Sequence, residues 1–118
     1  MKKIAIVGSR SFNDFDKLES FILNRINSGF ISKVVSGGAK GADTLGEEFA
    51  KKYNKSTLIF LADWETHGKA AGMIRNKDIV ENSDVVFAFW DGNSKGTKSS
   101  INLAKRMKKE LYICYIGE

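Results

Sequence analysis

One glycine-rich segment holds the residue types best suited to chemistry in this chain. Residues 36–43 read Ser-Gly-Gly-Ala-Lys-Gly-Ala-Asp, between an apolar run ending at Val35 and a stretch with apolar residues at helical spacing. A strand, a glycine turn and a helix in this order direct unpaired backbone N–H groups and the positive end of the helix dipole toward one point. Gly37, Gly38 and Gly41 let a ligand approach without meeting a Cβ atom. We predict a phosphate-binding loop, with a purely structural tight turn as the alternative.

Charged residues near this loop suggest how an anionic ligand would be held. Arg10 follows the first apolar run, and its guanidinium can bind two phosphate oxygens; a salt bridge to Asp43 or Asp91 is the alternative. Asp43 lies in the first turn of the predicted helix, where its carboxylate would repel a bound phosphate. We therefore expect Asp43 to bind ribose hydroxyls, hold a metal-bound water, or only interact with the helix dipole.

A polar segment at residues 62–69 interrupts the apolar pattern and is predicted to be a loop. Its Trp64 is a candidate for stacking on a base, or for covering the core or an oligomer contact. Lys69 and Arg75 flank the start of the next helix, where both can clamp the same anion; a solvated Lys69 is the alternative. His67 has no assigned role and is expected at the surface.

Several familiar motifs are missing. The first turn lacks Gly-x-Gly-x-x-Gly, and the segment 92–99 departs from the P-loop because its glycines are too close and Thr97 replaces the lysine. Thr97 and Ser99 are expected to cap the last helix or donate to a phosphate. With 1 His and 1 Cys, no metal site is predicted.

Apolar runs rich in β-branched residues alternate with stretches of helical periodicity along the chain. The runs predict buried strands at residues 4–7, 33–35, 57–61, 84–89 and 111–116. Helices are expected from Phe15, capped by Asp14 and ended by Ser28 and Gly29, then at 42–53, at 70–82, and around Ile101. This alternation predicts an α/β protein: a three-layer Rossmann-like fold with a five-stranded parallel sheet, order 3-2-1-4-5, in one domain over residues 1–118.

In such a sheet, ligands bind beyond the carboxyl ends of the strands, near the switch point between strands 1 and 4. The most glycine-rich or polar segments of the chain, residues 8–11, 36–43, 63–69 and 91–97, all fall at that edge. The coincidence of topology and composition predicts a binding crevice there.

Bulk composition narrows the class of protein. The net charge of +5 is compatible with an anionic ligand, although the basic runs lie among acids on helix surfaces. No apolar run approaches the roughly 20 residues that cross a bilayer, so no membrane partner is expected. The single Cys114 excludes an internal disulfide and is expected to be a buried thiol. We expect a cytoplasmic protein.

Together these loops resemble the SLOG superfamily, specifically the small YspA/YpsA-related Rossmann-like proteins. The resemblance rests on Gly-Ser-Arg at residues 8–10, Ser-Gly-Gly-Ala-x-Gly-Ala-Asp at 36–43, Gly-x-x-Arg-Asn at 72–76 and Gly-Thr at 96–97. It implies binding of a nucleotide or nucleotide-derived ligand, as a sensor or a nucleotide-processing protein, and a homo-oligomer.

Two related groups supply the alternatives. LOG enzymes are hydrolases that cleave the N-glycosidic bond of nucleoside monophosphates, and an ADP-ribose-like ligand is a further substrate class. Arg75 and the Gly-Thr pair match the LOG signature, but Ser100 occupies the position of the catalytic glutamate. Arg75 and Asp43 are therefore the candidate catalytic residues, with Asp63 and Glu65 as other carboxylates. The second alternative is a DNA-binding module similar to DprA.

The resulting site prediction contains no metal and no cofactor beyond the nucleotide-like ligand. The predicted ligand-binding residues are Gly8, Ser9, Arg10, Ser36, Gly37, Gly38, Gly41, Ala42, Asp43, Trp64, Lys69, Arg75, Asn76, Gly96 and Thr97.

Overall fold

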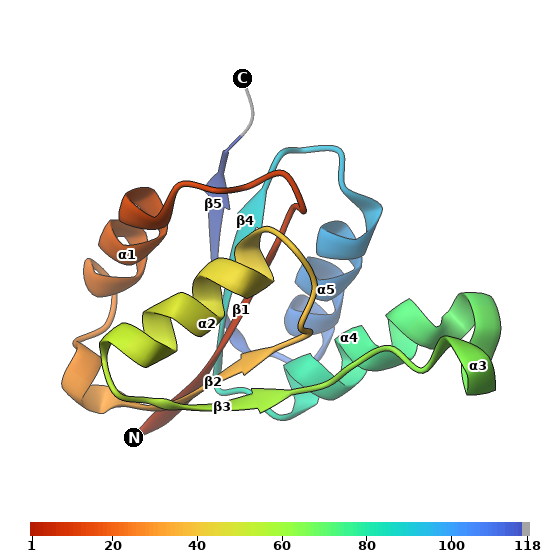
Figure 1. Cartoon of the computed structure of the whole chain (residues 1–118), viewed down its shortest axis with the longest axis horizontal. Helices are drawn as coiled ribbons and strands as arrows, with labels where there is room; N and C mark the ends of the chain where they lie inside the picture. Colours follow the sequence, from red (N-terminus) through yellow and green to blue (C-terminus); the bar gives the residue numbers. More distant parts are fainter. Residues whose placement is uncertain (117–118) are drawn as a thin grey trace.

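The computed structural model describes residues 1–116, and its centre is a five-stranded parallel sheet of order β3-β2-β1-β4-β5. The strands are β1 (Lys2–Gly8), β2 (Ile31–Ser36), β3 (Ser56–Ile59), β4 (Val85–Trp90) and β5 (Glu110–Tyr115). The helices are α1 (Phe15–Leu23), α2 (Ala42–Lys52), α3 (Trp64–His67), α4 (Ala71–Glu81) and α5 (Lys95–Arg106), with short 3₁₀ turns at Ser28–Phe30 and Gly68–Ala70. Helices α1 and α2 cover one face, and α4 and α5 the other (Figure 1). The predicted fold class and strand order are confirmed.

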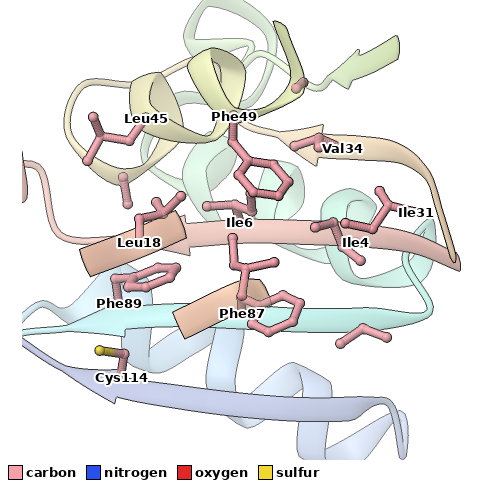
Figure 2. Close-up of a cluster of buried hydrophobic side chains, with 14 of the residues drawn as sticks. Ile4, Ile6, Leu18, Ile31, Val34, Leu45, Phe49, Phe87, Phe89 and Cys114 are labelled. Atoms are coloured by element: carbon pink, nitrogen blue, oxygen red, sulfur yellow. The ribbon is translucent and has the colours of Figure 1, made fainter. Parts of the chain in front are cut away.

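The core has two halves because successive side chains of a strand point to opposite faces. Ile4 and Ile6 of β1 pack with Phe49, Phe87 and others under α1 and α2, as Figure 2 shows. Ala5 and Val7 pack on the other face with Ile79 and Val80 of α4 and with residues of α5. A strand buried on both faces is continuously apolar, which is why residues 4–7 carry no alternation. Cys114 lies in the first half as a buried thiol, as predicted.

The prediction of a buried third strand is wrong. Ser56, Thr57 and Ile59 of β3 are exposed, and Leu61 just beyond the strand is 73% exposed. β3 is an edge strand with a neighbour on one side, and the helices leave much of it uncovered. Its apolar composition therefore predicted a strand correctly but not its environment.

Two other element boundaries differ from the sequence prediction. Asp14 does cap α1, accepting a hydrogen bond from Lys17 N at 3.1 Å. However, α1 ends at Leu23 rather than at Ser28 and Gly29, because its last turn tightens, with Arg25 N donating to Ile22 O. The segment predicted as a polar loop, residues 62–69, contains α3 and most of the second 3₁₀ turn.

No helix among residues 1–116 has the length and apolar character that spanning a membrane requires.

Gly8 closes the carboxyl end of β1 where two other segments touch its backbone. A Cβ atom at Gly8 would lie 2.4 Å from Phe89 O and 2.8 Å from Ala42 Cβ, so alanine forces the backbone apart. We expect Gly8→Ala to lower the free energy of unfolding by about 1–3 kcal/mol in urea denaturation. Gly96→Ala is the control, because a Cβ there meets nothing within 4 Å. Equal stability of the two variants would contradict this packing.

Candidate ligand-binding cleft

A hollow of about 440 Å³ lies at the carboxyl edge of the sheet, where the loops after β1 and β4 meet the middle of α4 and the first turn of α5. This is the switch point between strands β1 and β4, because the chain leaves these neighbouring strands toward opposite faces. We call it the cleft. Among the predicted site residues, its lining includes Gly8, Ser9, Arg10, Asp43, Arg75, Asn76, Gly96 and Thr97.

Ser9 joins the loops that form the floor of the cleft. Its N–H donates to Phe89 O at 3.0 Å, and its carbonyl accepts from Ala42 N at 3.3 Å. Its side-chain Oγ accepts from Asp91 N at 3.3 Å, and the residue is 2% exposed. The loop after β1 is thereby attached both to the start of α2 and to the loop after β4.

Arg10 follows this junction and lines the cleft with an exposed side chain. Across residues 1–116, its guanidinium forms no ion pair with Asp43, Asp91 or any other carboxylate within 4.0 Å. The alternative of an internal salt bridge is therefore not realised, and the guanidinium remains available to a ligand anion.

The glycines of the loop after β2 do not line the cleft. Gly41 has a φ of +80°, and a Cβ there would lie 2.3 Å from Ser9 O, so this glycine allows close packing of two loops. A Cβ at Gly38 would meet Leu61 Cδ2 at 2.7 Å on the outer side. Ser36 is fully buried, and its Oγ accepts from Gly38 N at 3.3 Å. Ala42 is also buried and outside the lining.

Arg75 reaches the same loop from α4. Its Nη1 donates to Gly37 O at 3.2 Å, and its Nε donates to Asn76 Oδ1 at 3.0 Å. Asn76 in turn donates through Nδ2 to Gly96 O at 3.4 Å. These bonds connect the glycine loop, α4 and the first turn of α5, and they hold the half-buried guanidinium in one orientation.

Asp43 is a carboxylate on the wall formed by α2 and is 8% exposed. Its Oδ2 accepts a hydrogen bond from Ala39 N at 3.1 Å. Burial raises the pKa of Asp43 to about 6, although this hydrogen bond and the Arg75 charge act in the opposite direction. No cation among residues 1–116 lies within 4.0 Å of it as an ion-pair partner.

The first turn of α5 forms the opposite wall. Its N-cap is Ser94, whose Oγ accepts from Thr97 N at 3.4 Å, so the expectation that Thr97 or Ser99 caps this helix is wrong. Asp91 accepts from Ser94 N at 2.7 Å and shapes the turn, and the same bonds lower the pKa of its carboxyl. A helix leaves its first N–H groups without intrahelical acceptors, and the N–H groups of Lys95 and Gly96 have no backbone acceptor within residues 1–116. Gly96 lines the cleft.

Trp64 and Lys69 lie away from the cleft lining, in the segment of α3 and the following 3₁₀ turn that projects from the body (Figure 1). Trp64 is 56% exposed, and its ring lies 3.6 Å from where a Cβ at Gly72 would stand. Lys69 and His67 are exposed.

Sequence reasoning missed part of the lining. Asp91, Ser94 and Ala39 line the cleft; they lie in segments predicted at this edge but were not among the predicted ligand-binding residues. A signal existed for Ser94, because Asp-Gly-Asn-Ser before a helical stretch is typical of an N-cap. Ser100, 2% exposed, lies in the same lining.

Comparisons with known proteins agree with this architecture. A model of the YAcAr family, described as the YspA, cpYpsA-related SLOG family, matches residues 2–67. Gene 61 protein of Mycobacterium phage D29 is 34% identical over 113 residues, which cover 90% of each chain. The solved structure of DNA processing protein A from Helicobacter pylori, described by its single-stranded DNA binding mode, has a TM-score of 0.71 at 24% identity. The match covers 94% of this chain but 64% of that one, and at this identity it supports the fold alone.

The buried Asp43 predicts an unusual dependence of stability on pH. Its pKa is raised from 3.8 to about 6 on folding, so the folded state binds the proton more tightly. The contribution of Asp43 to the free energy of unfolding is most favourable below pH 3.8, is lost as the pH rises toward 6, and stays lost above 6. By pH 7 the resulting loss in the free energy of unfolding is about 3 kcal/mol. Asp43→Asn should therefore gain stability relative to the parent between pH 4 and 7 in urea denaturation.

Asp16→Asn, which removes an exposed carboxylate outside the cleft, is the matched control and should give a curve parallel to the parent. A constant difference between Asp43→Asn and the parent across this pH range would show that the Asp43 carboxylate is not destabilised by burial.

Proposed function

Because this chain belongs to the YspA, cpYpsA-related SLOG family, we propose that its cleft binds the phosphate group of a nucleotide or nucleotide-derived ligand. The observation that carries the proposal is the position of Arg10 opposite the first turn of α5 in one hollow. A guanidinium and unpaired backbone N–H groups are the two donors that most often hold phosphate oxygens.

The charges of the cleft favour one place for the phosphate. Two arginines and two aspartates line it, and they differ in whether the protein already occupies their polar atoms. Arg75 already donates to Gly37 and Asn76, whereas Arg10 has no ion-pair partner among residues 1–116. Asp91 accepts backbone N–H bonds, and Asp43 lies on the α2 wall. We therefore place the phosphate between Arg10 and Gly96.

The volume sets the size of the ligand. About 440 Å³ lies within the range of small-ligand sites, which suits a nucleoside monophosphate or one nucleotide of a strand. The structural neighbour DNA processing protein A is described as binding single-stranded DNA. A nucleic acid would use the same phosphate donors, so its binding is an outcome that the test must separate from mononucleotide binding.

Removing the Arg10 guanidinium tests the phosphate contact. We expect adenosine 5′-monophosphate (AMP) to raise the midpoint of thermal unfolding in a concentration-dependent way. Arg10→Gln should weaken AMP binding by about 10- to 100-fold in isothermal titration calorimetry, because a charge-assisted hydrogen bond is lost. Arg106→Gln removes the same charge from the far end of α5 and is the control.

Equal binding by Arg10→Gln and Arg106→Gln would place the phosphate elsewhere. A short single strand of DNA titrated in parallel, at two salt concentrations, separates strand binding from mononucleotide binding, because strand affinity falls steeply with salt.

Hydrolysis of an N-glycosidic bond is a second candidate function, favoured by one specific observation. Ser100, at the position of the LOG glutamate, lines the same hollow as Asp43 and Arg75. Asp43 on α2 therefore offers a carboxylate in the hollow although α5 carries a serine at the LOG glutamate position. In this reaction the C1′–N bond breaks, the base leaves with the electron pair and takes up a proton, and water adds its hydroxyl to C1′. A carboxylate beside C1′ stabilises the developing positive charge of the sugar.

Product analysis distinguishes turnover from binding. If the chain is a hydrolase, incubation with AMP releases free adenine and ribose 5-phosphate above a protein-free blank, as measured by chromatography. Asp43→Asn should then lower the rate by at least about 100-fold, whereas Asp16→Asn should not. If AMP binds but no adenine is released, the chain binds AMP without hydrolysing it.

A further inference from the structure

Asp43 has a free carboxylate oxygen that opens into the cleft. The residue is 8% exposed and lines the hollow, and its Oδ2 is occupied by Ala39 N–H at 3.1 Å. Within residues 1–116 no hydrogen bond to Oδ1 accompanies the one from Ala39, although the Gly37 backbone lies near enough to lower the pKa of this carboxyl. No fully buried side-chain oxygen in that part of the chain lacks a partner. Oδ1 therefore keeps some accessible surface, on a residue that lines the cleft.

The surroundings of Asp43 do not neutralise it. Arg75 and Asp43 both approach Gly37, where a Cβ atom would lie 2.9 Å from Arg75 Nη1 and 3.0 Å from Asp43 Oδ2. Even so, the two side chains form no ion pair within 4.0 Å, because Arg75 donates to Gly37 O and Asn76. Glu47, one turn along α2, adds a second negative charge, and Arg10 and Asp91 line the same cleft. A carboxylate kept in this state accepts hydrogen bonds from a ligand and rejects a second anion.

The position of Asp43 relative to the proposed phosphate site identifies the ligand group. Gly41 packs against Arg10, with a Cβ there 2.6 Å from Arg10 Cα, and Asp43 lies two residues further along the chain. In a nucleotide, the group attached to the phosphate is the sugar, and a ribose presents two neighbouring hydroxyl donors. The 2′-hydroxyl is the group that separates ribose from deoxyribose.

We propose that Asp43 accepts hydrogen bonds from the ribose hydroxyls of the ligand, so that the cleft takes ribonucleotides in preference to deoxyribonucleotides. The inference rests on the proposed function, since it uses the phosphate position beside Arg10. It also separates this chain from a general single-strand DNA binder, which gains nothing from a 2′-hydroxyl.

The experiment compares AMP, 2′-deoxy-AMP and 3′-deoxy-AMP with the full chain by isothermal titration calorimetry. We expect AMP to bind about 10- to 100-fold more tightly than 2′-deoxy-AMP, because a hydrogen bond to a charged acceptor is lost. In Asp43→Asn the ratio should fall to below about 3-fold, while Asp16→Asn should keep the parent ratio. The comparison of ligands on the parent protein needs no variant, so it stands even if Asp43→Asn fails to fold.

The outcomes separate the two proposals. Equal affinity of the parent for AMP and 2′-deoxy-AMP, with Arg10→Gln weakening both, overturns the role of Asp43 and leaves phosphate binding intact. Tighter binding of the deoxy ligand also overturns it and favours DNA. No binding of any of the three overturns both proposals, whereas an AMP preference that Asp43→Asn abolishes supports them.

Discussion

Ser9 is the residue on which the cleft depends, because three segments distant in sequence meet at its backbone and side chain. It donates to Phe89 O, accepts from Ala42 N, and receives Asp91 N on its Oγ. These bonds are available only where β1 ends between its two neighbours, and the absence of a side chain at Gly8 permits the approach. The positions of Arg10 and of the first turn of α5 follow from this junction, since both are adjacent to segments that Ser9 attaches.

The cleft contains a carboxylate whose burial opposes folding. Asp43 lies on the α2 wall with one hydrogen bond from Ala39 and no ion pair within residues 1–116, and burial raises its pKa. A neutral side chain at this position would avoid the desolvation free energy of burying a charge. A chain that keeps an unpaired acid where a ligand can reach it gains a polar contact that is made only when the ligand is bound, which is the usual conflict between stability and function at binding sites.

The glycines of the loop after β2 make close contacts with other parts of the protein. Gly41 packs on the backbone of Ser9 and Arg10, and Gly37 leaves room for the Arg75 guanidinium beside Asp43. The glycines therefore support the side chains of the cleft, whereas Ala39 of the same loop lines it. Both a ligand-facing loop and a supporting loop require glycine. Composition does not distinguish a glycine that faces a ligand from one that faces another part of the chain.

Local patterns in the sequence were enough to predict the class of fold, the strand order and much of the cleft. Helical and strand periodicity are local, and parallel strands must place the loops after β1 and β4 at one edge. Arg10, Arg75 and the Gly96-Thr97 pair were found in this way. Four features became visible only in the folded protein: β3 is exposed, Ser94 caps α5, Asp43 is buried with no ion pair within residues 1–116, and Trp64 lies outside the cleft. Each of these depends on which distant segment covers a residue, and no local pattern records that.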